Sequence, residues 1–273
     1  FISIILIQKG GDIMGFLLLC ISTILIFLLL LYVMMHSKHS QLQQIFCCNI
    51  LCVFIISFGV LLQDICSNYL NINPIYFENF IYIGTCFLPI SMFFTGLIFT
   101  KTKISFKKWY IFLFIIPIIS LIILWTNPIH HLFYKSYSTN INECIYGKYI
   151  TIHHIYSYSL LLIGAFYLIK FSIKNSGFFS KQSVLIVFGI SIPIIVNVLG
   201  SFKLMPMTVY VTPITFTITI ICCALAIFKF NFLGVTPIAL QKIVDRISDS
   251  YVVLNDDGTI TDFNQTFLTS FHI

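Results

Sequence analysis

The sequence has very few charged residues, and none of them lies in the middle of an apolar segment. Charged residues make up 9% of the 273 residues, hydrophobic residues make up 59%, and the mean hydropathy is +1.00. No soluble domain has this composition, which predicts a membrane protein. Without charges inside the apolar segments, the chain has no proton relay or ion pathway of the usual kind. A pump or secondary transporter is therefore disfavoured.

Several short motifs are absent as well. The last apolar segment contains no lysine, which excludes a retinal Schiff base. The chain has neither an Asp-Arg-Tyr after the third segment nor an Asn-Pro-x-x-Tyr in the seventh, which disfavours a eukaryotic-type G-protein-coupled receptor. No ATP-binding glycine-rich motif, phosphoacceptor histidine region or cyclase motif occurs. We therefore expect no catalytic residue and no cofactor within these residues.

Seven apolar segments are long enough to cross a hydrocarbon core, which takes about 20 helical residues. We expect them at residues 13–35, 45–62, 79–100, 109–125, 152–174, 182–202 and 207–228. The first is too long for the apolar region of a signal peptide, and no cleavage site follows it. The predicted fold is an all-α membrane protein, a bundle of seven transmembrane helices in contact with the lipid bilayer.

The positions of the basic residues predict the orientation of this bundle. With the N-terminus outside, eleven of the fifteen fall on the cytoplasmic face, namely Lys38, Lys101, Lys103, Lys107, Lys108, Lys170, Lys174, Lys181, Lys229, Lys242 and Arg246. The outer face receives Lys9, Lys135, Lys148 and Lys203. We therefore predict an outer N-terminus and a cytoplasmic C-terminus. The net charge of +6 then reflects this topology and contact with anionic lipid headgroups, and no nucleic-acid partner is expected.

Two carboxylates lie near the predicted outer interface, where Asp64 ends the second segment and Glu78 begins the third. We favour the interpretation that both are helix-end residues facing water, with Glu78 stabilised by the dipole of the third helix. The alternative is a site for a cation or an amine between helices, because acids near membrane depth are candidates for function. Both residues are therefore kept as candidates for ligand binding.

The longest outer loop, residues 126–151, is rich in aromatic residues and histidines. Together with the start of the fifth segment it supplies the other outer candidates for ligand binding, which are Trp125, Asn127, His130, His131, His154 and Tyr158. Imidazole and thiolate groups suit zinc or copper. The spacing matches no metal motif, however, and adjacent histidines on a helix point in different directions. We interpret these histidines as interfacial residues and predict no metal site, with metal binding as the alternative.

Seven of the nine cysteines lie in apolar segments, where a thiol behaves as a small hydrophobic group. Cys66 and Cys144 are the two in outer loops. A disulfide between them would join the turn after the second segment to the longest loop, on the oxidising side of the membrane. Connectivity cannot be read from a sequence, so this pairing stays open.

Four prolines lie within the predicted spans, at 89, 117, 193 and 213. Each removes a backbone hydrogen bond and is able to kink its helix, so we expect Pro193 and Pro213 to take part in relaying a signal, with static kinks as the alternative. Asn197 lies four residues after Pro193 on the same helical face. Its amide is expected to satisfy the carbonyl freed by the proline, and it is also a candidate for ligand binding.

Five short motifs follow one another along the chain, namely Trp125-Thr126-Asn127-Pro128-x-His130-His131-Leu132-Phe133, Tyr156-Ser157-Tyr158, Gly189-x-x-x-Pro193-x-x-x-Asn197, Thr212-Pro213-Ile214 and Val235-Thr236-Pro237-Ile238-Ala239. Their order resembles a known family, the seven-helix N-terminal sensor region of many bacterial and archaeal histidine kinases. The resemblance covers the chain to about residue 240. The family often has an aspartate two positions before the Thr-Pro, where this chain has Tyr210.

The residues after the seventh segment predict a linker and the start of a soluble domain. Thr236 is able to cap a helix with Pro237 at its first position. The relay residues expected on this helix are Leu240, Val244 and Ile247, spaced as in a short coiled-coil seam. An amphipathic helix lying against the membrane is the alternative.

A hairpin is predicted beyond that linker. Residues 251–254 and 259–263 read as two strands around the Asp-Gly turn at 255–258, and Asn264 stands where a helix begins. This pattern resembles the opening of a PAS domain, although no complete PAS domain fits before Ile273. The expected organisation is a sensor domain at 1–235, a linker helix at 236–248 and the beginning of a PAS domain at 249–273.

The resemblance implies the membrane-embedded input module of a sensor histidine kinase in a two-component system of the prokaryotic plasma membrane. It also implies ATP and Mg²⁺ for a kinase domain encoded beyond residue 273, a response regulator as partner and a homodimer formed through the linker and the cytosolic domains. The alternatives are the sensor of a diguanylate cyclase and a small-molecule channel or transporter with a regulatory tail. The absence of inverted repeats disfavours the transporter.

Overall fold

A computed structural model of the chain describes residues 2–35, 40–101, 105, 107–140, 142–174, 178–205, 210–228, 250, 252–254, 260–263 and 265–271. The described helices are α1 (Ile2–Met35), α2 (Gln41–Tyr69), α3 (Ile75–Lys101), the 3₁₀ helix η1 (Lys108–Phe114), α4 (Ile115–Trp125), α5 (Asn127–His130), α6 (Ile150–Lys174), α7 (Phe178–Ser201), α8 (Val211–Phe228) and α10 (Gln265–Phe271). Two short hairpins, β1 (Tyr134–Ser136) with β2 (Ile145–Tyr146) and β3 (Val252–Leu254) with β4 (Ile260–Phe263), complete it.

Six of these helices are long and apolar enough to cross a membrane, and they confirm the first six predicted segments. They cover Ile13–Met35, Gln41–Tyr69, Ile75–Thr100, Lys108–Trp125, Ile150–Phe171 and Val184–Ser201. The apolar part of α8 is shorter, at Val211–Ile227. The predicted start of that seventh segment at residue 207 lies outside the described residues. Large apolar side chains on the outside of the bundle, such as Ile155 and Ile173, are exposed and face lipid.

The second helix is longer than predicted at both ends, because its polar terminal residues have partners within the protein. At the start, the Ser40 side chain accepts a hydrogen bond from the Gln43 backbone, and Gln43 Nε2 donates to the Val33 carbonyl at 2.9 Å. At the end, Gln63 Nε2 donates to the Pro74 carbonyl at 2.9 Å. Glutamines paired in this way can extend a helix beyond its apolar run.

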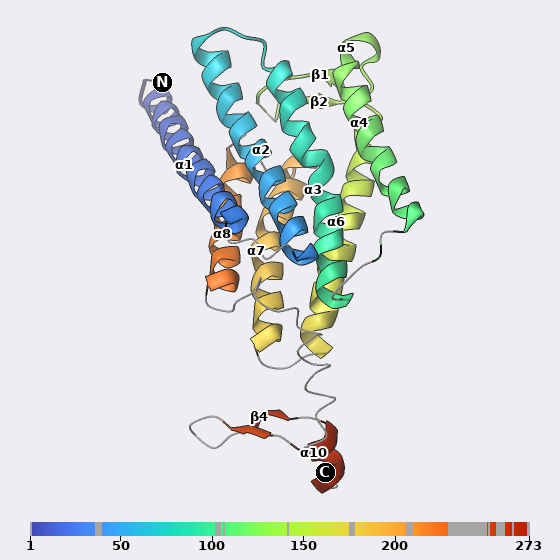
Figure 1. Cartoon of the computed structure of the whole chain (residues 1–273). Coiled ribbons are helices and arrows are strands. Elements are labelled where there is room, and N and C mark those ends of the chain that lie inside the picture. Colours follow the sequence, from blue (N-terminus) through green and yellow to red (C-terminus); the bar gives the residue numbers. More distant parts are fainter. Residues whose placement is uncertain are drawn as a thin grey trace.

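The helices form one bundle in which α3 packs between α2 and α6, α7 packs between α6 and α8, and α1 covers α2 and α8. Figure 1 shows α5 and the β1–β2 hairpin at the same end of the bundle as the start of α1. We call this the loop end. Helices α3 and α6 approach each other most closely at Gly96 and Gly164, where a Cβ on Gly96 would lie 2.4 Å from the Gly164 carbonyl oxygen. Small residues allow such backbone contact between membrane helices.

Two carbonyl groups that prolines leave without a helical partner are satisfied by hydroxyls of neighbouring helices. Pro117 cannot donate to the Leu113 carbonyl, which instead accepts a hydrogen bond from the Tyr156 hydroxyl of α6. The chain is a 3₁₀ helix up to Phe114 and α-helical from Ile115, whereas the sequence predicted one helical span at 109–125 that Pro117 is able to kink. Hydroxyl groups commonly replace bonds lost at prolines in membrane helices.

The second such carbonyl belongs to Gly189, four residues before Pro193 in α7. It accepts a hydrogen bond of 2.6 Å from Thr219 Oγ1 of α8. The prediction that the Asn197 amide fills this role is therefore wrong. Residues 206–209 lie outside the described residues, so the kink predicted at Pro213, which lies in the first turn of the described α8, stays a prediction. The Pro213 carbonyl accepts from Ser22 Oγ at 3.2 Å and joins α8 to α1.

The segment between α4 and α6 folds onto the loop end of the bundle. Phe133 and Tyr134 are buried there with Leu124 and Cys144. Asn127 fixes the backbone of this loop, because its Oδ1 accepts from the amides of Phe133 and Tyr134 at 2.9 and 3.0 Å while its Nδ2 donates to the Tyr134 carbonyl at 2.9 Å. The loop therefore places the Tyr134 side chain over the helix ends.

The C-terminal described residues contain the predicted hairpin. Strands β3 and β4 pair antiparallel, with Val252 opposite Phe263 and Leu254 opposite Ile260, and α10 follows at Gln265–Phe271. The predicted linker helix at 236–248, with the relay residues Pro237, Leu240, Val244 and Ile247, lies outside the described residues. So does the turn at 255–259.

Candidate functional site

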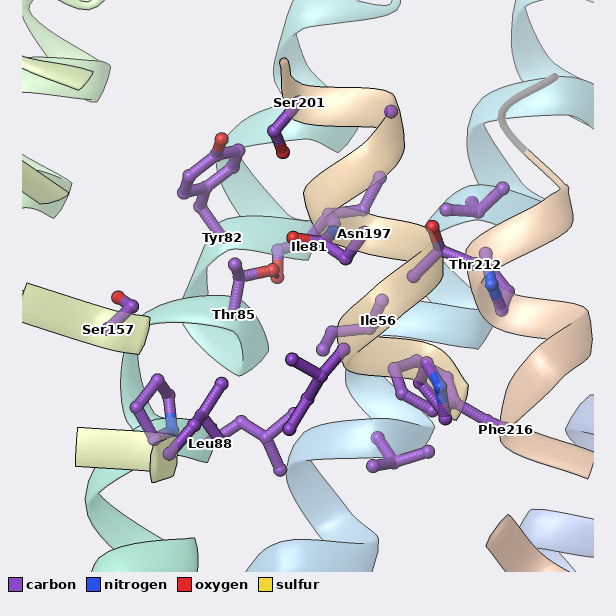
Figure 2. A pocket seen from close by; sticks show the side chains of 18 of the residues that line it. Ile56, Ile81, Tyr82, Thr85, Leu88, Ser157, Asn197, Ser201, Thr212 and Phe216 are labelled. Atoms are coloured by element: carbon purple, nitrogen blue, oxygen red, sulfur yellow. Dashed lines mark hydrogen bonds between the residues drawn. The ribbon is translucent and has the colours of Figure 1, made fainter. Parts of the chain in front are cut away.

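A cavity of about 290 Å³ lies between five helices, α2, α3, α6, α7 and α8, beneath the loop that contains β1 and β2. Its wall changes character along the bundle, with polar and aromatic side chains near the loop end and mostly aliphatic ones further in. Figure 2 shows part of this wall, formed by Ile56, Ile81, Tyr82, Thr85, Leu88, Ser157, Asn197, Ser201, Thr212 and Phe216. A concave, largely apolar space with a few polar groups is the usual form of a small-molecule site.

Glu78 of α3 is the acidic residue of the cavity wall. Its Oε1 accepts a hydrogen bond of 2.7 Å from the Tyr134 hydroxyl, and its Oε2 accepts one of 3.1 Å from the Tyr137 hydroxyl. Gln63 of α2 donates to the Tyr137 oxygen at 2.6 Å, and the Tyr134 hydroxyl also lies 3.3 Å from that of Tyr82. The loop, α2 and α3 are thus joined by one network around the carboxylate.

The two loop tyrosines of this network stay protonated. Burial raises the pKa of the Tyr134 hydroxyl, and the Glu78 charge raises it further. Burial and then the same carboxylate also raise the pKa of Tyr137. Both hydroxyls therefore remain hydrogen-bond donors to Glu78 throughout the neutral pH range.

Helix α6 contributes two histidines and a serine to the wall. His153 is 2% exposed, and its Nδ1 lies 3.1 Å from Ser120 Oγ of α4. The His154 ring packs against the Tyr146 and Tyr158 rings, with centroids 6.3 and 5.6 Å away. Ser157, one turn further in, is 7% exposed and its Oγ has no hydrogen-bond partner in the described structure. This buried hydroxyl is available to a ligand.

Hydrogen bonds in the cavity wall also join α6 to α7. The Tyr158 hydroxyl donates to Asn197 Oδ1 at 2.7 Å and lies 3.3 Å from Ser201 Oγ. Pro193 and Pro213 also line the cavity, so both of the described proline candidates for signal relay adjoin it. A ligand that reaches this part of the cavity would touch α7 and α8 directly.

The inner end of the cavity has polar groups that are already paired. Asn49 of α2 donates from Nδ2 to Thr95 Oγ1 at 2.6 Å, and its Oδ1 accepts from Ser91 Oγ at 2.6 Å. Because these groups satisfy one another between α2 and α3, they stabilise helix packing. The unpaired hydroxyl of the described cavity wall, Ser157 Oγ, therefore lies nearer the loop end.

Of the nine residues predicted to bind ligand, the structure places Glu78, His154, Tyr158 and Asn197 in one cavity wall. The other five lie elsewhere. Asp64 accepts hydrogen bonds from the Tyr210 hydroxyl and, at 3.0 Å, from Asn68 Nδ2, and is not part of the wall. The two carboxylates expected near the outer interface thus belong to separate environments.

The remaining four predicted residues belong to the loop itself. Asn127 is buried in the contacts that fix the loop backbone. His130 Nε2 lies 3.0 Å from Thr126 Oγ1, and its Nδ1 accepts from the Leu132 amide. His131 ends α5 with a left-handed backbone, and Trp125 is 53% exposed. Their contacts indicate a structural role, and ligand binding by them stays a prediction.

Neither the metal site nor the disulfide left open by the sequence is present in the described part of the chain. No group of three or more histidine, cysteine, aspartate or glutamate residues is placed to hold a metal ion there. Cys66 and Cys144 are free thiols, and Cys144 Sγ donates to the Ser136 carbonyl at 3.6 Å. Burial raises the pKa of the Cys144 thiol, which disfavours its reactive thiolate form.

Sequence reasoning missed several residues of this site, notably Gln63, Tyr82, Tyr134, Tyr137 and His153. Tyrosines are common at membrane interfaces, so their number alone gave no signal. Gln63 lies just beyond the predicted end of the second segment, and a glutamine in that position was a usable signal.

The described bundle defines a multi-pass membrane protein with a cavity between its helices. The family model of the N-terminal 7TM region of histidine kinase matches residues 18–237. The chain therefore belongs to this family, and it is a membrane sensory input module. No curated protein and no solved structure matches it.

Proposed function

We propose that this module detects a small effector in the cavity and passes the signal through α7 and α8 to a cytosolic histidine kinase. The observation that carries the proposal is the position of the cavity, which is lined by five helices including both of these. An effector that binds one packing of these helices more tightly than another shifts the population toward that packing. Glu78, His154, Tyr158 and Asn197 are its proposed contacts.

The proposed topology has the loop end outside the cell and the C-terminus in the cytoplasm, with α8 as the seventh span. The distribution of the basic residues supports it, as does the position of the start of α1 at the loop end (Figure 1). The apolar run of the sequence at 207–228, which is longer than the described α8, also supports a seventh span. The effector then reaches the cavity from the outside or from the outer part of the membrane.

The signal leaves the bundle through α8 and the linker at 236–248, where Pro237, Leu240, Val244 and Ile247 form the proposed seam of a homodimer. Pro193 and Pro213 adjoin the cavity and are proposed to relay the signal within the bundle. The β3–β4 hairpin followed by α10 supports the start of a PAS domain at 249–273. A kinase domain using ATP and Mg²⁺ and a response regulator complete the proposed pathway.

The experiment measures phosphoryl transfer by the full-length protein that carries this chain. In inside-out vesicles with radiolabelled ATP and Mg²⁺, it is expected to incorporate phosphate that is stable to base and labile to acid, as phosphohistidine is. The same vesicles without Mg²⁺ are the control, because phosphoryl transfer requires the metal. Acid-stable labelling, or none, would contradict a histidine kinase output.

A further inference from the structure

The Glu78 carboxyl group is bonded to two tyrosine hydroxyls and has no positively charged partner in the described structure. No lysine, arginine or histidine nitrogen among the described residues lies within ion-pair distance of it, and its partners are the hydroxyls of Tyr134 and Tyr137. Each carboxyl oxygen has a tyrosine hydroxyl beside it, so the ionised form would keep its hydrogen bonds and lack only a counter-charge. A charge removed from water without a counter-charge is costly. The site therefore favours a ligand that supplies a positive charge.

The rings around Glu78 suit the same kind of ligand. Tyr82, Tyr134, Tyr137 and Tyr146 line this end of the cavity. An ammonium group within about 6 Å of an aromatic ring centroid is attracted by the electrons of its face. The cavity wall itself contains no lysine or arginine among the described residues.

The rim of the cavity already holds one ammonium group in this manner. Lys203 Nζ donates to the carbonyls of Asn142 and Cys144 at 3.0 and 2.7 Å, and it lies 5.9 Å from the centroid of the Tyr146 ring. Carbonyl oxygens and a tyrosine ring of the loop thus accommodate a cation at the rim. Cys144 and Tyr146 also line the cavity.

The depth of the cavity defines the rest of the ligand. Ser157 offers a buried hydroxyl without a partner about one turn below the histidines of α6. Beyond it the wall is formed mainly by aliphatic and aromatic residues, including Ile56, Leu88 and Phe216 (Figure 2). If the charged group of a ligand lies near Glu78, the apolar portion of that ligand extends into this deeper, apolar part of the cavity.

We infer that the cavity binds an organic cation, an amine or quaternary ammonium compound with an apolar portion, whose charge lies against Glu78 and the surrounding tyrosine rings. The inference rests on the proposed function, because it names the chemical class of the effector for the same cavity. An uncharged apolar ligand would fill the volume and leave the carboxylate unbalanced. A fatty acid or phosphate ester would place a second negative charge beside it.

The test uses phenyltrimethylammonium as the probe and tert-butylbenzene, in which a carbon replaces the charged nitrogen, as its neutral analogue. Binding to the whole chain in nanodiscs is measured by saturation-transfer NMR against empty nanodiscs. We expect saturable binding of the cation and no saturable binding of the analogue. Glu78→Gln should weaken cation binding about 30-fold or more, which corresponds to about 2 kcal/mol.

The matched control is Asp64→Asn, which removes the same charge at the same end of the bundle from a residue outside the cavity wall. This variant should bind the probe like the unchanged protein. Thermal unfolding of both variants identifies a folding defect. If Glu78→Gln does not fold, the comparison of cation and analogue on the unchanged protein still tests the inference. Equal binding of both probes, or an unchanged affinity in folded Glu78→Gln, would overturn the inference.

This result is independent of the phosphorylation assay. If cavity substitutions change kinase output and the cation does not bind, the sensory function stands and the ligand class is wrong. If the cation binds with the expected dependence on Glu78 and the protein transfers no phosphate, the binding site stands and the kinase output is wrong.

Discussion

At the scale of single residues, the cavity depends on a carboxylate and two phenols that come from distant parts of the chain. Glu78 lies 56 residues before Tyr134 and 59 before Tyr137. The sequence marked Glu78, because an acid near membrane depth is unusual. It gave no reason to pair it with either tyrosine, since that pairing depends on how the loop folds onto the helices. The choice between a solvated carboxylate and a cation site therefore needed the structure.

The Tyr134 hydroxyl provides a prediction at this scale. Tyr134→Phe removes a donor from a partly buried carboxylate and should lower the free energy of unfolding by about 1.5–3 kcal/mol, the usual effect for hydrogen bonds to charged groups. Thermal and denaturant unfolding in detergent measure this. Tyr76→Phe is the control, because Tyr76 is 66% exposed and its change should stay within about 0.5 kcal/mol. Equal stability of the two variants would show that the hydrogen bond from Tyr134 to Glu78 does not stabilise the fold.

At the scale of elements, the apolar runs were predictable and their junctions were not. Six helices agree with the predicted segments, since the length of an apolar run is a local property. The contacts that complete the helices at Pro117 and Pro193 come from Tyr156 and Thr219 on other helices. Such partners are invisible to local patterns, which explains why Asn197 was assigned the wrong role.

The junction of α7 and α8 gives a prediction at this scale. Thr219→Val keeps the shape of the side chain, removes the bond to the Gly189 carbonyl and should lower the free energy of unfolding by about 1 kcal/mol. Thr217→Val on the same helix is the control, because no bond from Thr217 to α7 occurs in the described structure. Should both variants unfold like the parent protein, the carbonyl must be satisfied in another way.

At the scale of the whole molecule, the cavity extends from the loop end of the bundle to α8, the helix that precedes the C-terminal part of the chain. Two nearby positions of α6 allow this connection to be tested. Ser157 lines the cavity, whereas Ile155 is 65% exposed on the outside of the bundle. A phenylalanine at 157 fills space between the helices. One at 155 adds an apolar side chain to a lipid-facing surface.

The central claim is that the packing of helices around the cavity controls the output of the full-length protein. The decisive measurement is the rate of histidine autophosphorylation in vesicles for Ser157→Phe and Ile155→Phe, with thermal unfolding as a check that both are folded. Occupation of the cavity by a side chain should change the rate about fivefold or more, the lower end of typical coupling between sites. Ile155→Phe should leave it unchanged. Identical rates in folded Ser157→Phe and the parent protein would contradict the claim.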